Sequence, residues 1–509
     1  HREKSKNITG TDDTKIDFGD KERVYLVDVL KINETDDSYK YTWKDISVNC
    51  VGLYNAKSKE FVKELNENSF GVMILNNTSY YAESGGQIGD IGYIKSDDNE
   101  NEFEVTDVQH FGGFVLHIGR VTNGAIKLNG KYSTGVDYDN RRKIAPNHTM
   151  THVLNYGLRE VLGSECNQKG SLVDADKTRF DFSHGKALTI DQIVKIENIV
   201  NDIIGQELDI FTEEIEYSSI ITVKALRAMF GERYPKTVRV VSIGCKPSDA
   251  LKAPNDNRWF KFSIELCGGT HLKNTKEAQK FIIISEDALS SGVRRMVAVT
   301  YDGAKQAILE ANELEQEIDD ALLVEGSKLV KECARLNDKF ANAYIGYKRK
   351  HDLKKKMKKL NAKSLKFKQK ASKSLSKNVK DSIKKVIDNL KSDTMFIVQK
   401  MDAQVDAKSL KEGIKIWKKN KKSSQKGILL YSLNTNDSND KNQVIIMAEL
   451  TKDLVKKGLK AKEWVSNIVS LIDGKGGGND LKFQCIGSNQ SNINDVINKL
   501  NKFANDKLS

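Results

Sequence analysis

Two short motifs place metal-ligating side chains four positions apart: His148-Thr-Met-Thr-His152 and Cys267-Gly-Gly-Thr-His271. On a helix, residues i and i+4 project from one face about 6 Å apart, so His148 and His152 can share one ion. The two glycines between Cys267 and His271 predict a loop whose backbone folds tightly around the same ion. Three imidazoles and one thiolate suit tetrahedral zinc. The sequence therefore predicts a zinc site built from these four residues.

Each pair alone is weak evidence, because paired histidines are more often ordinary core or surface residues. The chain has only eight histidines, however, and three of them lie in these two motifs beside a cysteine. A zinc protease would carry His-Glu-x-x-His, with the glutamate beside the first histidine as general base. Thr149 occupies that position, which excludes the protease interpretation.

The elements that must position these motifs belong to an α+β, multidomain chain, since 509 residues suffice for about three domains. Short strand-like runs such as 71–75 and 103–108, separated by Gly, Asn and Asp, predict a small antiparallel β-barrel or sandwich over residues 25–138. A zinc-binding α+β domain is expected over 139–302. Within it, residues 148–162 are expected to form an amphipathic helix that carries the first motif.

From residue 303 the spacing of apolar residues changes to heptads. They recur at alternating spacings of four and three, as in Ala307, Ala311, Leu314, Ile318 and Ala321. This series predicts a coiled-coil-like helical arm over 303–392. Residues 393–509 alternate strand-like and helix-like runs and are expected to form a C-terminal α/β domain. Residues 1–24 are interpreted as a linker or terminal segment.

Positive charge is concentrated in the second half of the predicted arm. The formal net charge of the chain is +12, whereas residues 348–391 hold eighteen Lys or Arg against three Asp, so the remainder sums to −3. An anionic partner such as nucleic acid would meet this stretch first. The alternative is a solvated, lysine-coated helix face, and the charge pattern favours neither interpretation.

Composition and cysteine usage indicate a cytoplasmic protein without a membrane partner. No stretch approaches the roughly 18 uninterrupted apolar residues that a membrane span needs. Six cysteines are spread along the chain without a Cys-x-x-Cys pair, which argues against a disulfide scaffold and for a reducing compartment. The chain begins at His1 rather than Met, and its first twenty residues lack a signal or transit pattern. We therefore expect a fragment of a longer cytoplasmic protein.

Further motifs occur in a fixed order around the metal-ligating pairs. Gln168-Lys-Gly-Ser171, Arg179-Phe-Asp-Phe182 and Gly292-Val-Arg-Arg295 accompany the pairs, Tyr81-Ala-Glu-Ser-Gly-Gly-Gln-Ile-Gly-Asp-Ile-Gly92 precedes them, and Asp473-Gly-Lys-Gly-Gly-Gly478 follows. From about residue 25 to its end, the chain resembles the C-terminal portion of alanyl-tRNA synthetases. That portion has an editing domain with its preceding barrel, a helical arm and a terminal domain. The resemblance implies that the aminoacylation domain, with its ATP site, lies upstream of residue 1.

The resemblance implies a part of an alanine–tRNA ligase that hydrolyses mischarged seryl- or glycyl-tRNA(Ala) with zinc as cofactor. A pocket for alanine cannot strongly reject a side chain that differs by one methyl or hydroxyl, because such differences are worth only about 1–3 kcal/mol. The resemblance also implies Thr151 and Gln168 as the catalytic pocket residues. The alternative roles are a hydrogen bond from Thr151 to its own helix and a turn cap by Gln168.

Binding of tRNA(Ala) is expected at four places in the sequence. They are the Gly-rich segment (Gly85, Gly86, Gln87), the strand motif (Arg294, Arg295), the basic arm (Lys354, Lys355, Lys358, Lys359) and the terminal loop (Lys475). The two glycines permit either close approach to a nucleic-acid end or a corner of the barrel. Residues 474–478 predict a backbone nest for phosphate, although the longer Gly-rich continuation of the family is missing.

Two rival interpretations stay open. In the first rival interpretation, the chain is a free-standing trans-editing deacylase. In the second, it is a tRNA-binding and oligomerisation module without hydrolysis. A start without Met argues against the first rival, and an intact set of four ligands argues against the second. A homo-oligomer is expected to form through the helical arm or the C-terminal domain.

Overall fold

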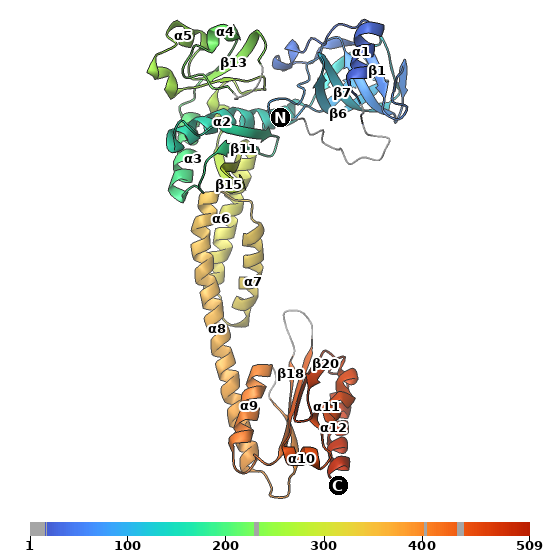
Figure 1. Ribbon diagram of the computed structural model, residues 1–509, viewed down its shortest axis with the longest axis vertical. Helices are drawn as coiled ribbons and strands as arrows, with labels where there is room; N and C mark the ends of the chain where they lie inside the picture. The colour runs from blue at the N-terminus through green and yellow to red at the C-terminus, as the bar shows by residue number, and fades with distance from the viewer. Residues whose placement is uncertain (1–15, 17, 229–233, 402–404, 435–441) are drawn as a thin grey trace. The chain divides into compact units, whose positions relative to one another are not determined.

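The computed structural model describes residue 16 and residues 18–228, 234–401, 405–434 and 442–509 (Figure 1). The chain divides into two compact units, residues 1–315 with 342–354 and residues 316–341 with 355–509. Both units combine helices with sheets, so the predicted α+β, multidomain class is confirmed. None of the helices in the described ranges combines the length and the apolar character that a membrane-spanning segment requires. Most of the predicted segment 1–24 lies outside the described residues.

A closed antiparallel barrel forms the first part of the first unit, which confirms the predicted barrel. Its strand order is β2-β1-β4-β7-β6-β5-β9, and pairing of β1 with β9 closes the sheet. The strands are β1 (Ser47–Asn55), β2 (Glu60–Phe61), β4 (Phe70–Leu75), β5 (Gly92–Lys95), β6 (Glu102–Phe111), β7 (Phe114–Asn123) and β9 (Lys131–Val136). β3 (Glu64–Asn66) and β8 (Ala125–Lys127) form a separate pair. Alternate residues such as Phe103 and Val105 point inward and are buried, as expected for strands around one core.

Outside the barrel, α1 (Asp20–Val24) continues into the π-helical turn η2 (Tyr25–Val29). Leu26 of this turn is fully buried in a second apolar cluster, which also contains Val72 and Ile74 of β4. Since these two β4 residues alternate with the inward-facing Met73 and Leu75, the turn covers the outer face of the strand.

A four-stranded antiparallel sheet with two helices follows the barrel. Its strand order is β10-β11-β16-β15, with β10 (Gln168–Val173), β11 (Thr178–Ser183), β15 (Phe281–Ser290) and β16 (Val293–Thr300). The helices α2 (Tyr138–Leu162) and α3 (Ile190–Gly205) share one apolar core with this sheet. α3 begins at a capping box between Thr189 and Gln192. Sheet and helices together fix the position of the first metal motif on α2.

The helix that carries the first motif starts earlier than predicted. α2 begins at Tyr138 instead of His148, and Asp137 caps it by accepting a hydrogen bond from the backbone N–H of Asn140. Pro146 lies inside this helix and lacks the backbone donor for the carbonyl of Arg142. Because Arg142 is exposed, its free carbonyl can be hydrated and the helix continues through the proline.

A smaller three-stranded sheet carries the second motif. It consists of β12 (Ile210–Glu216), β13 (Thr237–Ile243) and β14 (Ser263–Leu266), with α4 (Tyr217–Ile220) and α5 (Pro247–Lys252) beside it. Its own apolar cluster includes Val240, Trp259 and Ile264. The motif Cys267–His271 leaves the end of β14 as a loop, as predicted. The loop is therefore held by a packed sheet on one side of the site.

Three helices occupy the region of the predicted arm: α6 (Tyr301–Leu323), α7 (Gly326–Asn342) and α8 (Tyr347–Asp388). The apolar heptad residues of α6 and α7 are buried from Ala307 to Leu336, and Leu353, Met357 and Leu360 of α8 are buried as well. Within the second unit, Arg335 and Lys339 of α7 both pair with Glu317 of α6. The helices are confirmed, and the coiled-coil geometry stays a prediction.

The C-terminal part of the second unit is a five-stranded sheet covered by helices on both faces (Figure 1). Its strand order is β17-β18-β19-β21-β20, with β17 parallel to β18 and the other pairs antiparallel. The strands are β17 (Phe396–Lys400), β18 (Gly427–Asn434), β19 (Gln443–Glu449), β20 (Lys475–Gly478) and β21 (Lys482–Gly487). The helices are α9 (Ala407–Lys419), α10 (Lys452–Lys456), α11 (Ala461–Val469) and α12 (Ile493–Leu508). Neighbours on β18 divide between the faces: Ile428 packs toward α9 and Leu429 toward α11.

The terminal Gly-rich motif is a strand rather than the predicted phosphate nest. Lys475–Gly478 forms β20, which pairs with β21 at the edge of the sheet. The prediction was wrong because a nest needs successive backbone N–H groups that converge on one anion, whereas strand N–H groups alternate in direction. Lys475 is exposed, so its contact with tRNA stays a prediction that no longer involves a nest.

Candidate metal centre

The structure brings the two predicted pairs together. The ligand atoms of His148, His152, Cys267 and His271 all lie within 4.8 Å of one another. The Cys267 Sγ atom is 3.4 Å from His148 Nε2 and 3.3 Å from His271 Nε2. A tetrahedral ion with metal–sulfur and metal–nitrogen bonds of about 2.3 and 2.0–2.1 Å has ligand–ligand edges of about 3.5 Å. The edges from Cys267 to His148 and His271 therefore fit such an ion, and all four ligand atoms lie close enough together to share it.

Hydrogen bonds orient two of the three imidazoles toward the cluster. His148 Nδ1 donates to Gln87 Oε1 over 2.6 Å. The hydroxyl of Thr149 donates to the carbonyl of Ala145, so over 3.2 Å its oxygen accepts the bond from His271 Nδ1. In both rings the Nδ1 atom carries the proton, which leaves Nε2 as the ligand atom.

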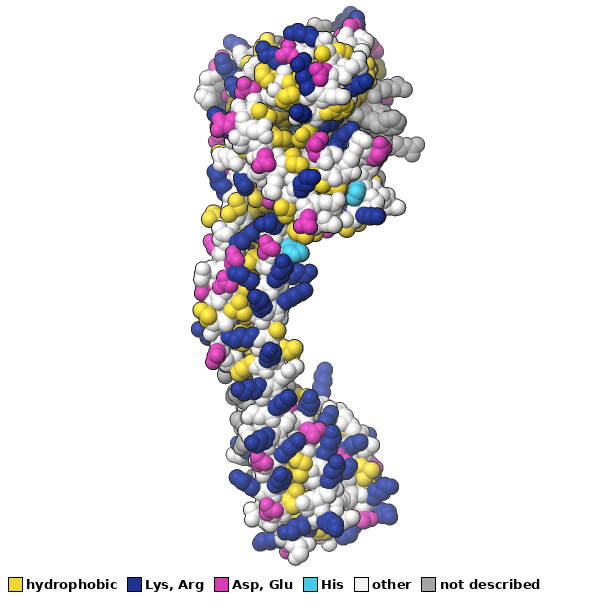
Figure 2. Space-filling model, turned by 90° about the vertical axis from the view of Figure 1, so that its left-hand side faces the viewer, with side chains coloured by type: hydrophobic (Ala, Val, Ile, Leu, Met, Phe, Trp, Pro, Cys, Tyr) yellow, Lys and Arg dark blue, Asp and Glu magenta, His cyan; other side chains and the backbone are white. Residues whose placement is uncertain are grey.

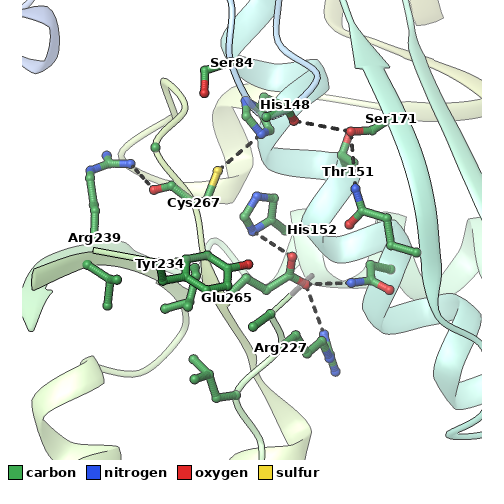
Figure 3. A pocket seen from close by; sticks show the side chains of 18 of the residues that line it. Ser84, His148, Thr151, His152, Ser171, Arg227, Tyr234, Arg239, Glu265 and Cys267 are labelled. Atoms are coloured by element: carbon green, nitrogen blue, oxygen red, sulfur yellow. Dashed lines mark hydrogen bonds and ion pairs between the residues drawn. The ribbon is translucent and has the colours of Figure 1, made fainter. Parts of the chain in front are cut away.

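The third imidazole faces a carboxylate. His152 Nδ1 lies 3.4 Å from Glu265 Oε2 (Figure 3). Glu265 belongs to β14, two residues before Cys267, and its side chain is buried. All three histidines thus meet an oxygen behind the ring, but the chemical nature of that oxygen differs from one ring to the next.

A network of contacts holds the Cys267–His271 loop against α2. Arg239 Nη1 donates to the carbonyls of Cys267 and Gly269, each over 2.9 Å. Tyr41 donates to the carbonyl of Gly268 over 2.8 Å, and the Arg239 guanidinium lies 4.0 Å from the centre of its ring. At Gly269 an added Cβ would lie 2.0 Å from His148 Cε1, whereas at Gly268 it would meet nothing within 4 Å. Only the second glycine is therefore required for the approach of the loop.

Burial keeps the ligands uncharged until an ion binds. Burial, helped by the positive charges of Arg227 and Arg239, lowers the pKa of His152 to about 3, and it lowers the pKa of His148 and His271 as well. Neutral imidazole is the form that ligates metals. Burial raises the pKa of the Cys267 thiol to about 11. Binding of a cation would therefore release the Cys267 proton.

The cluster lies in the wall of a pocket of about 1060 Å³, which His148, His152 and Cys267 line (Figure 3). Thr151 and Gln168 line the same pocket. Thr151 donates to the carbonyl of Asn147 over 2.7 Å and lies 2.5 Å from Thr178 Oγ1, so the alternative bond to its own helix is present. Gln168 opens β10 and donates to Ser171 over 3.3 Å. Both residues are thus at the pocket, as their predicted role requires.

The Gly-rich segment packs against β10. Gly85 and Gly86 have positive φ angles of 58° and 87°, and an added Cβ at Gly86 would lie 2.3 Å from Ser171 Oγ. Gln87 is fully buried, with its amide bound to His148 and Thr270. The Gln87 side chain has no exposed surface in this structure, and its contact with tRNA stays a prediction. Contacts of Gly85 and Gly86 with tRNA stay a prediction.

The two arginines of the strand motif already have carboxylate partners. Arg294 pairs with Glu286 on β15, and Arg295 donates to both oxygens of Asp181 on β11 over 2.7 and 2.8 Å. These pairs join neighbouring strands of one sheet, and contacts of Arg294 and Arg295 with tRNA stay a prediction. By contrast, Lys354, Lys355, Lys358 and Lys359 are all exposed on α8, and the described residues offer them no ion pair.

Sequence reasoning missed the residues behind the ligands. Glu265, Arg239 and Asn155 carry no spacing signal that links them to the motifs, and Gln87 was assigned to tRNA instead. The only local signal is that Glu265 stands two residues before Cys267 on an alternating strand, where a buried carboxylate is unusual.

Comparison with known proteins places the chain in a class. Residues 2–140 match the family described as tRNA synthetases class II (A), residues 238–297 match the threonyl and alanyl tRNA synthetase second additional domain, and residues 393–506 match the DHHA1 domain. The second match contains Cys267 and His271 of the cluster. These matches place the chain in the class of aminoacyl-tRNA synthetases, with a second additional domain of the threonyl and alanyl type.

Within that class, the curated relatives are alanine–tRNA ligases. A cytoplasmic alanine–tRNA ligase of Dictyostelium discoideum is 37% identical over 479 residues, with 93% of this chain and 50% of the relative covered. That of Bombyx mori is 35% identical over 498 residues, with 94% and 51% covered. The chain therefore belongs to the alanyl-tRNA synthetase family, as the motifs predicted, and spans about half the length of these relatives.

A solved structure of the C-Ala domain from Aquifex aeolicus alanyl-tRNA synthetase shares 14% identity with this chain. It covers 22% of this chain and 91% of its own length, with a TM-score of 0.18. The likeness is too low to support an argument about this chain.

Proposed function

We propose that the chain is the editing portion of a cytoplasmic alanine–tRNA ligase, which hydrolyses mischarged seryl- or glycyl-tRNA(Ala) with zinc as cofactor. The observation that carries the proposal is the cluster of three imidazoles and one thiolate in the wall of a large pocket. Zinc held by His148, His152, Cys267 and His271 would supply a positive centre that polarises or orients the aminoacyl group. The match to the second additional domain over residues 238–297 supports the same function.

Thr151 is suited to distinguish serine from alanine. Its hydroxyl proton is donated to Asn147, and Thr178 can donate to the same oxygen, so one lone pair of Thr151 stays available on the pocket side. The hydroxyl of a seryl group can donate to that lone pair, whereas an alanyl group cannot. Gln168, across the pocket on β10, would contact the aminoacyl end as a second polar group.

The proposed domain boundaries are those predicted from the sequence. The barrel subdomain spans 25–138, the zinc-binding editing domain 139–302, the helical arm 303–392 and the C-terminal α/β domain 393–509. The exposed lysines 354, 355, 358 and 359 on α8 support tRNA binding by the arm, and the arm or the C-terminal domain would provide the contacts of a homo-oligomer.

A deacylation assay tests this function. We expect the chain to hydrolyse seryl-tRNA(Ala) much faster than alanyl-tRNA(Ala), and equal rates on the two would remove the editing proposal. Thr151→Val keeps the shape and loses the hydroxyl, so it should change the serine-to-alanine ratio by about 3- to 10-fold, the worth of one neutral hydrogen bond. The zinc content of this variant should stay that of the wild type.

The same assay distinguishes the rival interpretations. A chain that binds tRNA(Ala) without deacylating any charged form would be a binding and oligomerisation module, for which the exposed lysines of α8 are the supporting observation. Sequencing the transcript upstream of the codon for His1 separates a ligase portion from a free-standing deacylase.

A further inference from the structure

Glu265 is a buried carboxylate whose two oxygens have different partners. Oε1 accepts hydrogen bonds from Asn155 Nδ2 over 3.0 Å and Ser263 Oγ over 3.3 Å, and Arg227 Nη1 lies 3.5 Å away. Oε2 faces His152 Nδ1 at 3.4 Å (Figure 3). The three donors thus fix the orientation of the carboxylate and leave its second oxygen for the imidazole.

His152 has Glu265 as its ionic neighbour. Its Nδ1 atom is fully buried and makes no hydrogen bond within the described residues, and Glu265 Oε2, 3.4 Å away, is the charged oxygen that faces it. The corresponding atoms of His148 and His271 donate to an amide oxygen and a hydroxyl oxygen, both of which are neutral. His152 is therefore the one ligand in the described cluster that faces a negative charge.

We propose that Glu265 is a positioning residue of the metal centre: it holds His152 with Nε2 toward the ion and provides a negative charge that stabilises the bound cation. The proposal rests on the metal centre of the proposed function. Arg227 Nη1 lies 3.5 Å from Glu265 Oε1, and Arg239 Nη1 donates to the carbonyls of Cys267 and Gly269, so two positive side chains already lie beside the cluster. A carboxylate behind a ligating imidazole both orients the ring and strengthens it as a donor.

The arrangement predicts that glutamine cannot replace Glu265. In a Glu265→Gln variant, the donors of Asn155, Ser263 and Arg227 select the amide oxygen, so the amide NH₂ group must face His152. Nδ1 would then have to accept a hydrogen bond, and the proton would move to Nε2, where it blocks the metal. Glu265→Asp keeps the charge but shortens the reach, so its effect should be smaller.

Zinc affinity of the full chain, measured by competition with a chromophoric chelator, is the first test. We expect Glu265→Gln to weaken zinc binding by about 10- to 100-fold, the range for lost partners of metal ligands, and Glu265→Asp to recover part of the loss. Glu286→Gln is the matched control, because Glu286 is also a buried carboxylate paired with an arginine but lies on β15, in contact with Arg294. Its zinc affinity should equal that of the wild type.

A second measurement uses the wild-type chain and does not depend on the folding of a variant. In the zinc-loaded chain with ¹⁵N-labelled histidine, the Nδ1 proton of His152 should resonate further downfield than those of His148 and His271, because it alone binds a carboxylate. Equal zinc affinity of wild type and Glu265→Gln, or a His152 bound through Nδ1, would overturn the inference while leaving the metal centre intact. A wild-type chain that binds no zinc would overturn both.

Discussion

The metal centre and the exposed lysines of α8 (Lys354, Lys355, Lys358 and Lys359, here called the lysine coat) differ in how their polar side chains are held. At the metal centre, four ligands and their hydrogen-bond partners come from segments as far apart as Gln87 and His271, and the side chains are buried against one another. On α8, lysines follow one another along a single helix, and Lys354, Lys355, Lys358 and Lys359 are exposed and without an ion pair among the described residues. Figure 2 shows many Lys and Arg side chains on one face of the molecule. A single substitution should therefore matter greatly in the first region and little in the second.

Removing a ligand should have the largest effect. Cys267→Ala takes away the only thiolate of the cluster, so we expect the zinc content to fall from about one ion per chain to well below half and deacylation to fall with it. Elemental analysis and the deacylation assay measure this. Cys333→Ala is the control, because Cys333 is a buried residue of α7 and should affect packing alone. If Cys267→Ala keeps a full zinc complement, the proposed ligand set is wrong.

Gly268 and Gly269 of the Cys267–His271 loop allow a tight and a tolerant position to be compared within the metal centre itself. Gly269→Ala would place a Cβ 2.0 Å from His148 Cε1 and must displace that ligand, whereas Gly268→Ala meets only open space. We expect zinc affinity to fall at least about tenfold in the first variant and to stay unchanged in the second. Chelator competition on the two purified chains compares them directly, and similar affinities would show that the loop can move away from α2.

The ligand pairs could be grouped from the sequence because an i, i+4 spacing and a Cys-Gly-Gly-Thr-His loop are local patterns. The barrel strands and the terminal sheet were also predictable, since alternation and turn residues are local. The partners behind the ligands could not be found in this way: Gln87 stands 61 residues before His148, and nothing in its neighbourhood marks it as buried. The prediction of a phosphate nest at 475–478 failed for a related reason. The conformation of this segment is decided by its pairing with β21, which the local sequence does not reveal.

Buried and exposed charge can also be compared within one helix. Arg141 of α2 is fully buried, pairs with the buried Asp90 and donates to the carbonyls of Lys40 and Ser79 over 2.9 and 2.7 Å. Its neighbour Arg142 is different: its Nη1 atom lies 2.5 Å from Asp139 Oδ1, but 67% of the Arg142 side chain is exposed.

Arg141→Met leaves Asp90 buried and unpaired, so we expect it to lower the free energy of unfolding by about 3–5 kcal/mol. Arg142→Met should lower it by no more than about 1 kcal/mol. Urea unfolding of the full chain, followed by circular dichroism, measures both. An equal decrease in the free energy of unfolding of the two variants would mean that burial does not determine how much these ion pairs stabilise the fold.

The smallest effect per residue is expected on α8, where only the sum of several lysines should be measurable. Lys354, Lys355, Lys358 and Lys359 are exposed on one helix whose apolar residues Leu353, Met357 and Leu360 are buried. Exposed lysines can bind phosphates without reading sequence, and each such contact adds close to one unit to the slope of log affinity against log salt. Changing all four to Gln should weaken tRNA(Ala) binding at low salt and reduce the slope by up to about 4, with zinc and helix content unchanged.

Lys356→Gln is the matched control, because Lys356 Nζ lies 2.6 Å from a carboxylate oxygen of Asp319 and already has an ionic partner. Lys356→Gln should therefore leave the slope unchanged. If the fourfold variant also leaves it unchanged, these exposed lysines form a solvated surface and the tRNA contact lies elsewhere.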